Sequence, residues 1–179
     1  HIVLLDNDQQ KLKTYGEISR ELSRRLDPDL TFEVTSDARA ALTGVDYIIT
    51  TIRAGGDAGR LFDEQTCLAH GVLGQETTGA GGFAMAIRSV PTLVYYCTLA
   101  REVANPGHLI FNFTNPSGII TQALRSKGFD NVYGICDAPS GFIKQLEEIL
   151  EIPYGTLDIE CYGLNHLSWF RNAKVNGRD

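Results

Sequence analysis

The feature that most constrains this chain is the alternation of short apolar runs with longer segments of helical spacing. Strand-like runs at residues 2–5, 31–35 and 46–51 each lead into polar or charged residues. Between the first two runs, apolar side chains recur every three or four residues, as on one face of a helix: Leu12, Tyr15, Ile18, Leu22 and Leu26. Strands that alternate with helices in this way indicate an α/β fold built on a doubly wound, mostly parallel sheet.

The alternation continues to about residue 150 and then changes. After residue 60 the pattern predicts helices at 61–69, 82–103, around 119–124 and at 139–150, and strands at 108–113, 132–135 and 157–164. Residues 169–175 are expected to pair antiparallel with the last of these strands. Asn176-Gly177 then favours a hairpin turn.

Length and composition exclude several classes of protein. The 179 residues are 43% hydrophobic and 21% charged, which is ordinary globular composition. A net charge of −6 argues against nucleic acid or an acidic membrane surface as a partner. We expect no membrane-spanning stretch and no signal peptide, and the four cysteines lack the paired spacing of a disulfide or zinc framework. These features favour a cytoplasmic protein.

The strongest candidate site combines Cys136, Asp137 and His166. Cys136 and Asp137 follow a short apolar run and precede Pro139, a residue favoured in the first turn of a helix. His166 ends a second strand-like run. Ligands bind at the carboxyl ends of strands in open α/β sheets, so the thiol and the imidazole could hold a metal beside Asp137 as proton donor. The alternative is a buried cysteine, a helix-capping aspartate and a histidine satisfied within the fold.

Polar residues at three other predicted strand ends could also bind ligands. Asp6 stands where a carboxylate holds ribose hydroxyls in nucleotide-binding sheets, although Asp6 or Asp8 could instead cap the next helix. Arg53, beside glycines, could bind a carboxylate or phosphate, or lie on the surface. Asn115 could hydrogen-bond sugar hydroxyls or form a turn. Residues 79–84 fit G-x-G-x-x-A, but no strand precedes them, so we expect a flexible or substrate-facing loop rather than a dinucleotide fingerprint.

Six motifs in this order resemble those of family 4 glycoside hydrolases, the NAD-dependent 6-phospho-glucosidases and their relatives. They are Leu4-Leu5-Asp6-Asn7-Asp8, Thr51-Ile52-Arg53, Gly74-Gln75-Glu76-Thr77-Thr78-Gly79, Asn112-Phe113-Thr114-Asn115-Pro116, Ile135-Cys136-Asp137-Ala138-Pro139 and Tyr162-Gly163-Leu164-Asn165-His166. The resemblance implies a Rossmann-like NAD-binding domain at residues 1–150, lacking its first strand and glycine-rich turn. Residues 151–179 would begin a second, α+β domain that binds substrate and metal.

The resemblance also implies a chemistry unlike the two-carboxylate mechanism of most glycosidases. NAD takes a hydride from C3 of a 6-phospho-glucoside, a divalent metal, usually manganese, polarises the C2 and C3 oxygens, and a base removes the C2 proton. The glycosidic oxygen leaves by elimination with help from an acid, water adds back, and the hydride returns. The expected partner is therefore a small sugar phosphate, bound by a homodimer or homotetramer.

The same motifs imply roles for individual residues. The expected metal ligands are Cys136 and His166, and the expected catalytic acid, as in α-specific relatives, is Asp137. The expected cofactor contacts are Asp6, Asn112 and Glu76, the last at the junction of nicotinamide and sugar. The expected substrate contacts are Arg53, Asn115 and Asn165.

Three departures from the family pattern leave alternatives open. The glycine-rich turn and the tyrosine base of relatives are not in this sequence, so we expect the chain as given not to turn over substrate. Asp137 slightly favours an α-linked substrate, whereas Thr77-Thr78 resembles the β-specific members. The alternatives are a family member acting on unphosphorylated hexosides or uronides, an NAD-dependent 2-hydroxy-acid dehydrogenase, and a non-catalytic protein that binds NAD or a sugar phosphate.

Overall fold

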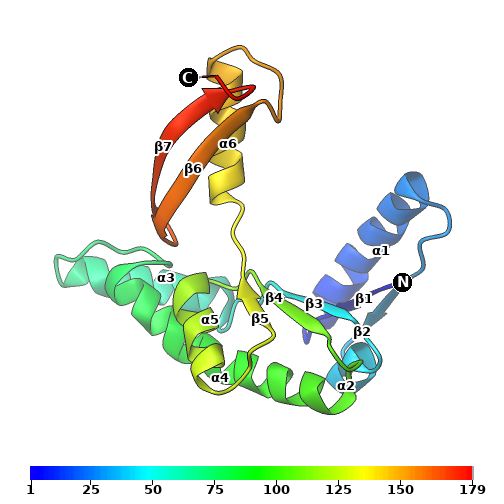
Figure 1. Ribbon diagram of the computed structural model, residues 1–179. Helices are drawn as coiled ribbons and strands as arrows, with labels where there is room; N and C mark the ends of the chain where they lie inside the picture. The colour runs from blue at the N-terminus through cyan, green and yellow to red at the C-terminus, as the bar shows by residue number, and fades with distance from the viewer. Residues whose placement is uncertain (179) are drawn as a thin grey trace. The chain divides into compact units, whose positions relative to one another are not determined.

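The computed structural model describes residues 1–178, which form seven β-strands and six α-helices (Figure 1). In chain order these are β1 (Ile2–Leu5), α1 (Gln9–Leu26), β2 (Phe32–Thr35), α2 (Ala38–Leu42), β3 (Tyr47–Thr50), α3 (Gly56–Ala69), α4 (Gly79–Val103), β4 (Leu109–Asn112), α5 (Ser117–Ser126), β5 (Val132–Gly134), α6 (Ala138–Ile149), β6 (Leu157–Leu164) and β7 (Leu167–Val175). The predicted alternation of strand and helix is confirmed.

The strands of the described residues form three sheets. β1 pairs in parallel with β2, and β4 lies between β3 and β5 in a three-stranded sheet, where β4 and β5 are parallel. β6 and β7 form the antiparallel pair expected from the sequence. The predicted turn follows β7: Asn176 and Gly177 have φ angles of 51° and 77°, and positive φ at both central residues is the mark of a type I′ hairpin turn.

The chain folds into two compact units. The first contains residues 1–48 and 94–109, and the second contains residues 49–93 and those from 110 onwards. The core of the second unit includes five side chains that are at most 1% exposed: Leu93, Ile110, Ile120, Leu124 and Val132. These boundaries differ from the functional division predicted at residue 150, which stays a prediction.

The apolar face predicted for α1 is mostly exposed. Leu12 is buried, but four side chains of the same stripe are 53% to 73% exposed: Tyr15, Ile18, Leu22 and Leu26. α1 instead contacts β2 closely at Gly16, where an added Cβ would lie 2.7 Å from Cγ1 of Val34. The spacing predicted the helix but not its buried face, because burial depends on which neighbours the helix has.

Residues 79–84 are the first turns of α4, so the predicted loop is wrong. Rejection of the dinucleotide fingerprint holds, since residues 71–78 contain no strand. The glycines serve close packing: a Cβ on Gly82 would lie 2.6 Å from the carbonyl oxygen of Thr77, and one on Gly81 would overlap that of Gln75. The segment that carries Glu76 can therefore lie directly against the start of the helix.

Among the described residues, α4 is the one helix long and apolar enough to cross a membrane, judged by length and composition alone. We expected no such stretch from the sequence. This is weak evidence, because core helices of globular proteins pass the same test. α4 contributes Leu93, Cys97 and Ala100 to the protein interior, each at most 2% exposed, and its Arg88 pairs with Asp63. Packing within the fold accounts for part of its apolar character, since 39% of the apolar window is buried.

Candidate functional site

Cys136 and His166 meet although they are 30 residues apart in the chain. Sγ of Cys136 lies 3.7 Å from Nε2 of His166. Two ligands of one ion, with bonds of about 2.3 Å to sulfur and about 2.0 Å to nitrogen at a tetrahedral angle, lie about 3.5 Å apart. The pair therefore fits two positions of one coordination shell. No cluster of three or more His, Cys, Asp or Glu side chains suited to a metal occurs among residues 1–178, so further ligands must come from outside these side chains.

The end of β5 positions Cys136. The N–H of Ile135 donates a hydrogen bond to the carbonyl oxygen of Asn112 at 2.9 Å, and the chain then leaves the sheet. Gly134 is needed for this path, because a Cβ there would lie 2.7 Å from Oγ1 of Thr121 on α5. The close approach of β5 to α5 leaves the Cys136 thiol half-buried at the carboxyl end of the strand.

Asp137 lies directly before α6 and is exposed. Asp137 is the N-cap residue of α6, as the alternative reading held, but its side chain accepts no hydrogen bond from the helix N-terminus. Pro139 stands in the first turn of α6, as the sequence predicted. The carboxyl group is therefore not committed to holding the helix, and it follows the Cys136 thiol directly in the chain.

A two-residue hairpin turn presents His166. β6 ends at Leu164 and β7 begins at Leu167, which face each other across the hairpin. Asn165 and His166 form the turn, and His166 has a φ angle of 60°, which is uncommon for a residue with a side chain and concentrated at functional sites. The sequence had suggested that the imidazole stands at the end of a strand in a parallel sheet. It comes instead from the turn of an antiparallel hairpin.

A cavity of about 760 Å³ runs along α5 and has Cys136, Pro139 and Asn165 in its wall. Oδ1 of Asn165 is buried and has no hydrogen-bond partner within residues 1–178. A buried polar atom without a partner costs about 1–3 kcal/mol, so a hydroxyl that donates to this oxygen would be favoured. The predicted substrate contact by Asn165 remains a prediction that this geometry supports.

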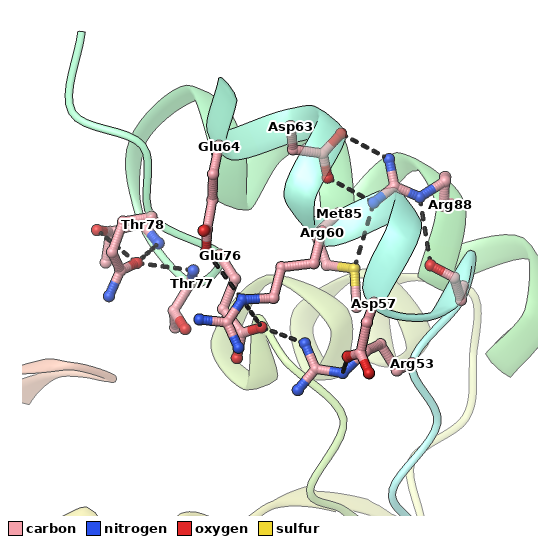
Figure 2. A network of polar contacts seen from close by, with 12 residues as sticks. Arg53, Asp57, Arg60, Asp63, Glu64, Glu76, Thr77, Thr78, Met85 and Arg88 are labelled. Atoms are coloured by element: carbon pink, nitrogen blue, oxygen red, sulfur yellow. Dashed lines mark hydrogen bonds and ion pairs between the residues drawn. The ribbon is translucent and has the colours of Figure 1, made fainter. Parts of the chain in front are cut away.

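Arg53 and Glu76 form an ion pair (Figure 2). The Glu76 carboxylate also lies 3.4 Å from Nε of Arg60, which pairs in turn with Glu64 at 2.9 Å. The hydrogen bond to Glu64 and the charge of Glu76 raise the pKa of the Arg60 guanidinium. The expected substrate contact and one expected cofactor contact are therefore joined directly, and a second arginine shares the carboxylate.

Asp6 follows β1 in the first compact unit. Asp8, and not Asp6, caps α1, because its Oδ1 accepts hydrogen bonds from the N–H groups of Gln10 and Lys11 at 2.9 and 3.1 Å. Among residues 1–178, Oδ1 of Asp6 accepts only the N–H of Asp8, at 2.9 Å. The capping alternative is thereby removed for Asp6, and its ribose-binding role stays a prediction.

Asn112 is fully buried, and its side chain hydrogen-bonds β3, the segment after β4 and α5. Its Oδ1 accepts the Thr50 hydroxyl at 3.0 Å, and its Nδ2 donates to the Thr114 carbonyl and the Thr121 hydroxyl at 3.3 and 3.2 Å. With 0% exposure it offers no surface to a cofactor, which favours a structural role; the expected cofactor contact stays a prediction. Asn115 is half-exposed, and its side chain has no hydrogen-bond partner in the described part of the chain.

Reasoning from the sequence missed Arg60 and the pair formed by Asp63 and Arg88. Arg60 and Glu64 stand four residues apart on α3, the spacing of a helical ion pair, so a local signal existed. Asp63 and Arg88 are 25 residues apart and come from different helices, so no sequence spacing links them.

This fold and site define an α/β protein of nucleotide-binding type with a cysteine–histidine pair where a strand ends. The model of the family described as "Family 4 glycosyl hydrolase" matches residues 1–152. The chain therefore belongs to family 4 of the glycosyl hydrolases, as the six motifs had indicated.

Curated and solved relatives agree with this assignment. The chain is 36% identical to the 6-phospho-beta-glucosidase BglT of Thermotoga maritima over 99% of its own length and 42% of that protein. It is also 36% identical to the phospho-alpha-glucosidase PagL of Clostridium acetobutylicum, over 94% of its own length and 38% of that protein. The 6-phospho-beta glucosidase of Thermotoga maritima solved with manganese, NAD+ and glucose-6-phosphate superposes with a TM-score of 0.89 at 33% identity, covering 99% of this chain and 42% of that one. The chain thus spans about two fifths of the length of these relatives, and the Rossmann-like fold is confirmed.

Proposed function

We propose that this protein is a glycosidase that hydrolyses 6-phospho-glucosides with the help of NAD and a divalent metal ion, Mn²⁺ being the first candidate. The observation that carries the proposal is the 3.7 Å approach of Cys136 Sγ to His166 Nε2, with Asp137 as the next residue. Family membership supports it, as does the Thermotoga maritima relative solved with manganese, NAD+ and glucose-6-phosphate.

The residues present fit a metal held partly by the protein. Cys136 and His166 supply two ligands, and the unpartnered Oδ1 of Asn165 in the wall of the adjoining cavity supports binding of a ligand that donates a hydrogen bond. Because Mn²⁺ prefers oxygen ligands, sugar oxygens and water are suited to complete the shell. Held by these residues, the metal would supply polarisation of the C2 and C3 oxygens of the sugar, and NAD would supply reversible hydride transfer at C3.

Side chains of this chain would bind the sugar and move one proton. Asp137 donates a proton to the departing glycosidic oxygen, and its exposed position leaves the carboxyl group accessible. Arg53 binds the anionic group of the substrate. Asn115 and Asn165 hydrogen-bond sugar hydroxyls, which orients the ring. This assignment separates binding of the phosphorylated sugar from proton donation.

Cofactor contacts are proposed for Asp6 and Glu76. Asp6 holds ribose hydroxyls at the end of β1. Glu76 lies at the junction of nicotinamide and sugar, and its ion pair with Arg53 supports a position between cofactor and substrate contacts. A homodimer or homotetramer and a cytoplasmic location belong to the same proposal.

An α-linked substrate is the preferred choice within this activity, because Asp137 matches the acid of α-specific relatives. Relatives named for either anomer are equally similar to the chain, at 36% identity, so a direct comparison must decide.

The deciding experiment incubates the full-length protein with NAD, Mn²⁺ and a reductant. It compares the α and β forms of 4-nitrophenyl glucoside 6-phosphate with the two unphosphorylated glucosides. Cleavage of the α compound supports the proposal in full, and cleavage of the β compound alone corrects the anomer. Cleavage of only unphosphorylated compounds contradicts the substrate class. Binding of NAD and Mn²⁺ without any cleavage or exchange of the sugar C2 proton contradicts the enzymatic proposal.

A further inference from the structure

A second ion pair joins α3 and α4 beside the Arg53–Glu76 cluster (Figure 2). Two nitrogens of Arg88 donate to the two carboxylate oxygens of Asp63, at 2.9 and 2.5 Å. The Asp63 side chain is 5% exposed and that of Arg88 is 31% exposed. The hydrogen bond to Asp63 raises the pKa of Arg88, so the guanidinium stays charged. A two-pronged pair of this kind fixes orientation as well as distance.

The third nitrogen of the same guanidinium hydrogen-bonds the turn that follows Arg53. Nε of Arg88 donates to the carbonyl oxygen of Ala54 at 3.3 Å. A Cβ on Gly55 would lie 3.1 Å from that nitrogen, so the side chain packs directly on the backbone of the turn. Gly55 has a φ angle of 84°, and the N–H of Gly56 donates to the carbonyl oxygen of Arg53 at 3.0 Å. Arg88 therefore determines where the backbone leaves Arg53.

We infer that Arg88, oriented by Asp63, is a positioning residue that holds the turn after Arg53 so that Arg53 can bind the anionic group of the substrate. The inference rests on the proposed role of Arg53. A misplacement of about 1 Å at a binding group can cost roughly a hundredfold in catalysis, so a distant clamp can have a large effect. Lysine cannot replace Arg88, because a single ammonium group lacks the planar fork needed to bind Asp63 twice and Ala54 at once.

The test uses the full-length protein and measures binding of glucose 6-phosphate by calorimetry together with kcat and KM. Arg88→Lys keeps the charge, and we expect it to weaken binding and raise KM by roughly tenfold or more, with NAD affinity unchanged. Because the effect acts through Arg53, the double variant with Arg53→Lys should be no worse than Arg53→Lys alone. Arg24→Lys is the matched control, since Arg24 forms an exposed ion pair with Glu21 and should leave all values unchanged.

Two results would overturn the inference. One is unchanged glucose 6-phosphate binding in Arg88→Lys. The other is a double variant whose fold-loss of glucose 6-phosphate affinity equals the product of the losses in Arg88→Lys and Arg53→Lys. If Arg88→Lys does not fold, Asp63→Asn provides the same comparison, because it keeps the side-chain shape and removes the charge that orients Arg88. A wild-type protein that binds glucose 6-phosphate with this dependence on Arg53 and Arg88, yet cleaves no phosphorylated glucoside, contradicts the proposed function and supports the inference.

Discussion

Sγ of Cys136 and Nε2 of His166 lie 3.7 Å apart, and each belongs to a pair of consecutive residues in the candidate site. Asp137 follows the thiol in the connection from β5 to α6, and Asn165 precedes the imidazole in the turn from β6 to β7. Two backbone segments thus bring a carboxyl group, an amide, a thiol and an imidazole to one place. A metal bound by the pair would also tie the hairpin to the end of β5.

Replacement of Cys136 by serine tests the metal site. We expect Mn²⁺ affinity to fall more than about tenfold and hydrolysis to be lost. Loss of a residue that only hydrogen-bonds a metal ligand already lowers metal affinity by about tenfold, so loss of a ligand should cost more. NAD binding should remain, because no proposed cofactor contact changes. Electron paramagnetic resonance of free Mn²⁺ measures the affinity. Cys161→Ser is the control, since Cys161 is an exposed thiol on β6. Wild-type Mn²⁺ affinity in Cys136→Ser would contradict the site.

Asp137→Asn tests the proton donor. Proton donation by a positioned acid contributes about 10²–10⁴-fold, so kcat for a poor alkyl leaving group should fall by that factor. The loss should be much smaller for nitrophenolate, which leaves without protonation, and Mn²⁺ affinity should be retained. Steady-state kinetics on both substrates give the comparison. Asp130→Asn, an exposed carboxylate in the wall of the same cavity, is the control. Equal losses for both leaving groups would argue against an acid role.

Asn112→Ala tests the buried amide. The change removes a side chain at 0% exposure and strands the hydroxyl of Thr50 and the carbonyl of Thr114, so the free energy of unfolding should fall by about 2–4 kcal/mol. NAD affinity of the folded protein should be unchanged if the role is structural. Thermal and urea unfolding measure the first quantity and calorimetry the second. A selective loss of NAD affinity at normal stability would support the cofactor role expected from the sequence.

Two glycine-to-alanine changes test the packing of α4. Gly82→Ala places a methyl group 2.6 Å from the Thr77 carbonyl and should destabilise the fold by about 1–3 kcal/mol. Gly141→Ala in α6 meets no atom within 4 Å and should stabilise by about 0.5–1 kcal/mol, since alanine is the better helix former. Urea unfolding of both variants supplies the measurement. A stabilising effect of Gly82→Ala would mean that the close approach at Gly82 does not exist.

Cys97 should make the free energy of unfolding depend on pH in the alkaline range. Burial raises the pKa of its thiol to about 11, whereas a cysteine in an unfolded chain ionises near about 8.5. The native state therefore keeps a proton that the unfolded state releases, and the free energy of unfolding should decline as pH rises from about 8.5 to about 11. Urea unfolding across this range should show a shallower decline in Cys97→Ala than in the wild type, and no such change in Cys161→Ala. An unaltered slope in Cys97→Ala would contradict the burial effect.

Local patterns in the sequence predicted much of the fold. Strand and helix positions followed from hydrophobic spacing, which each segment displays by itself, and β6 coincides with the predicted strand at residues 157–164. The motif around Cys136 and Asp137 could be placed after a strand for the same reason. The boundaries of α3 and α4 were less accurate, because their first turns contain glycines that local preference assigns to loops.

The sequence by itself determined the α/β class, the family, and which residues carry chemically useful groups. Only the tertiary structure decided that Asn112 is buried, that Arg53 pairs with Glu76, and that Arg88 clamps the turn after Arg53. The physical reason is the same in each case. Local preference acts over a few residues, whereas the separation of side chains tens of residues apart is set by strand pairing and helix packing.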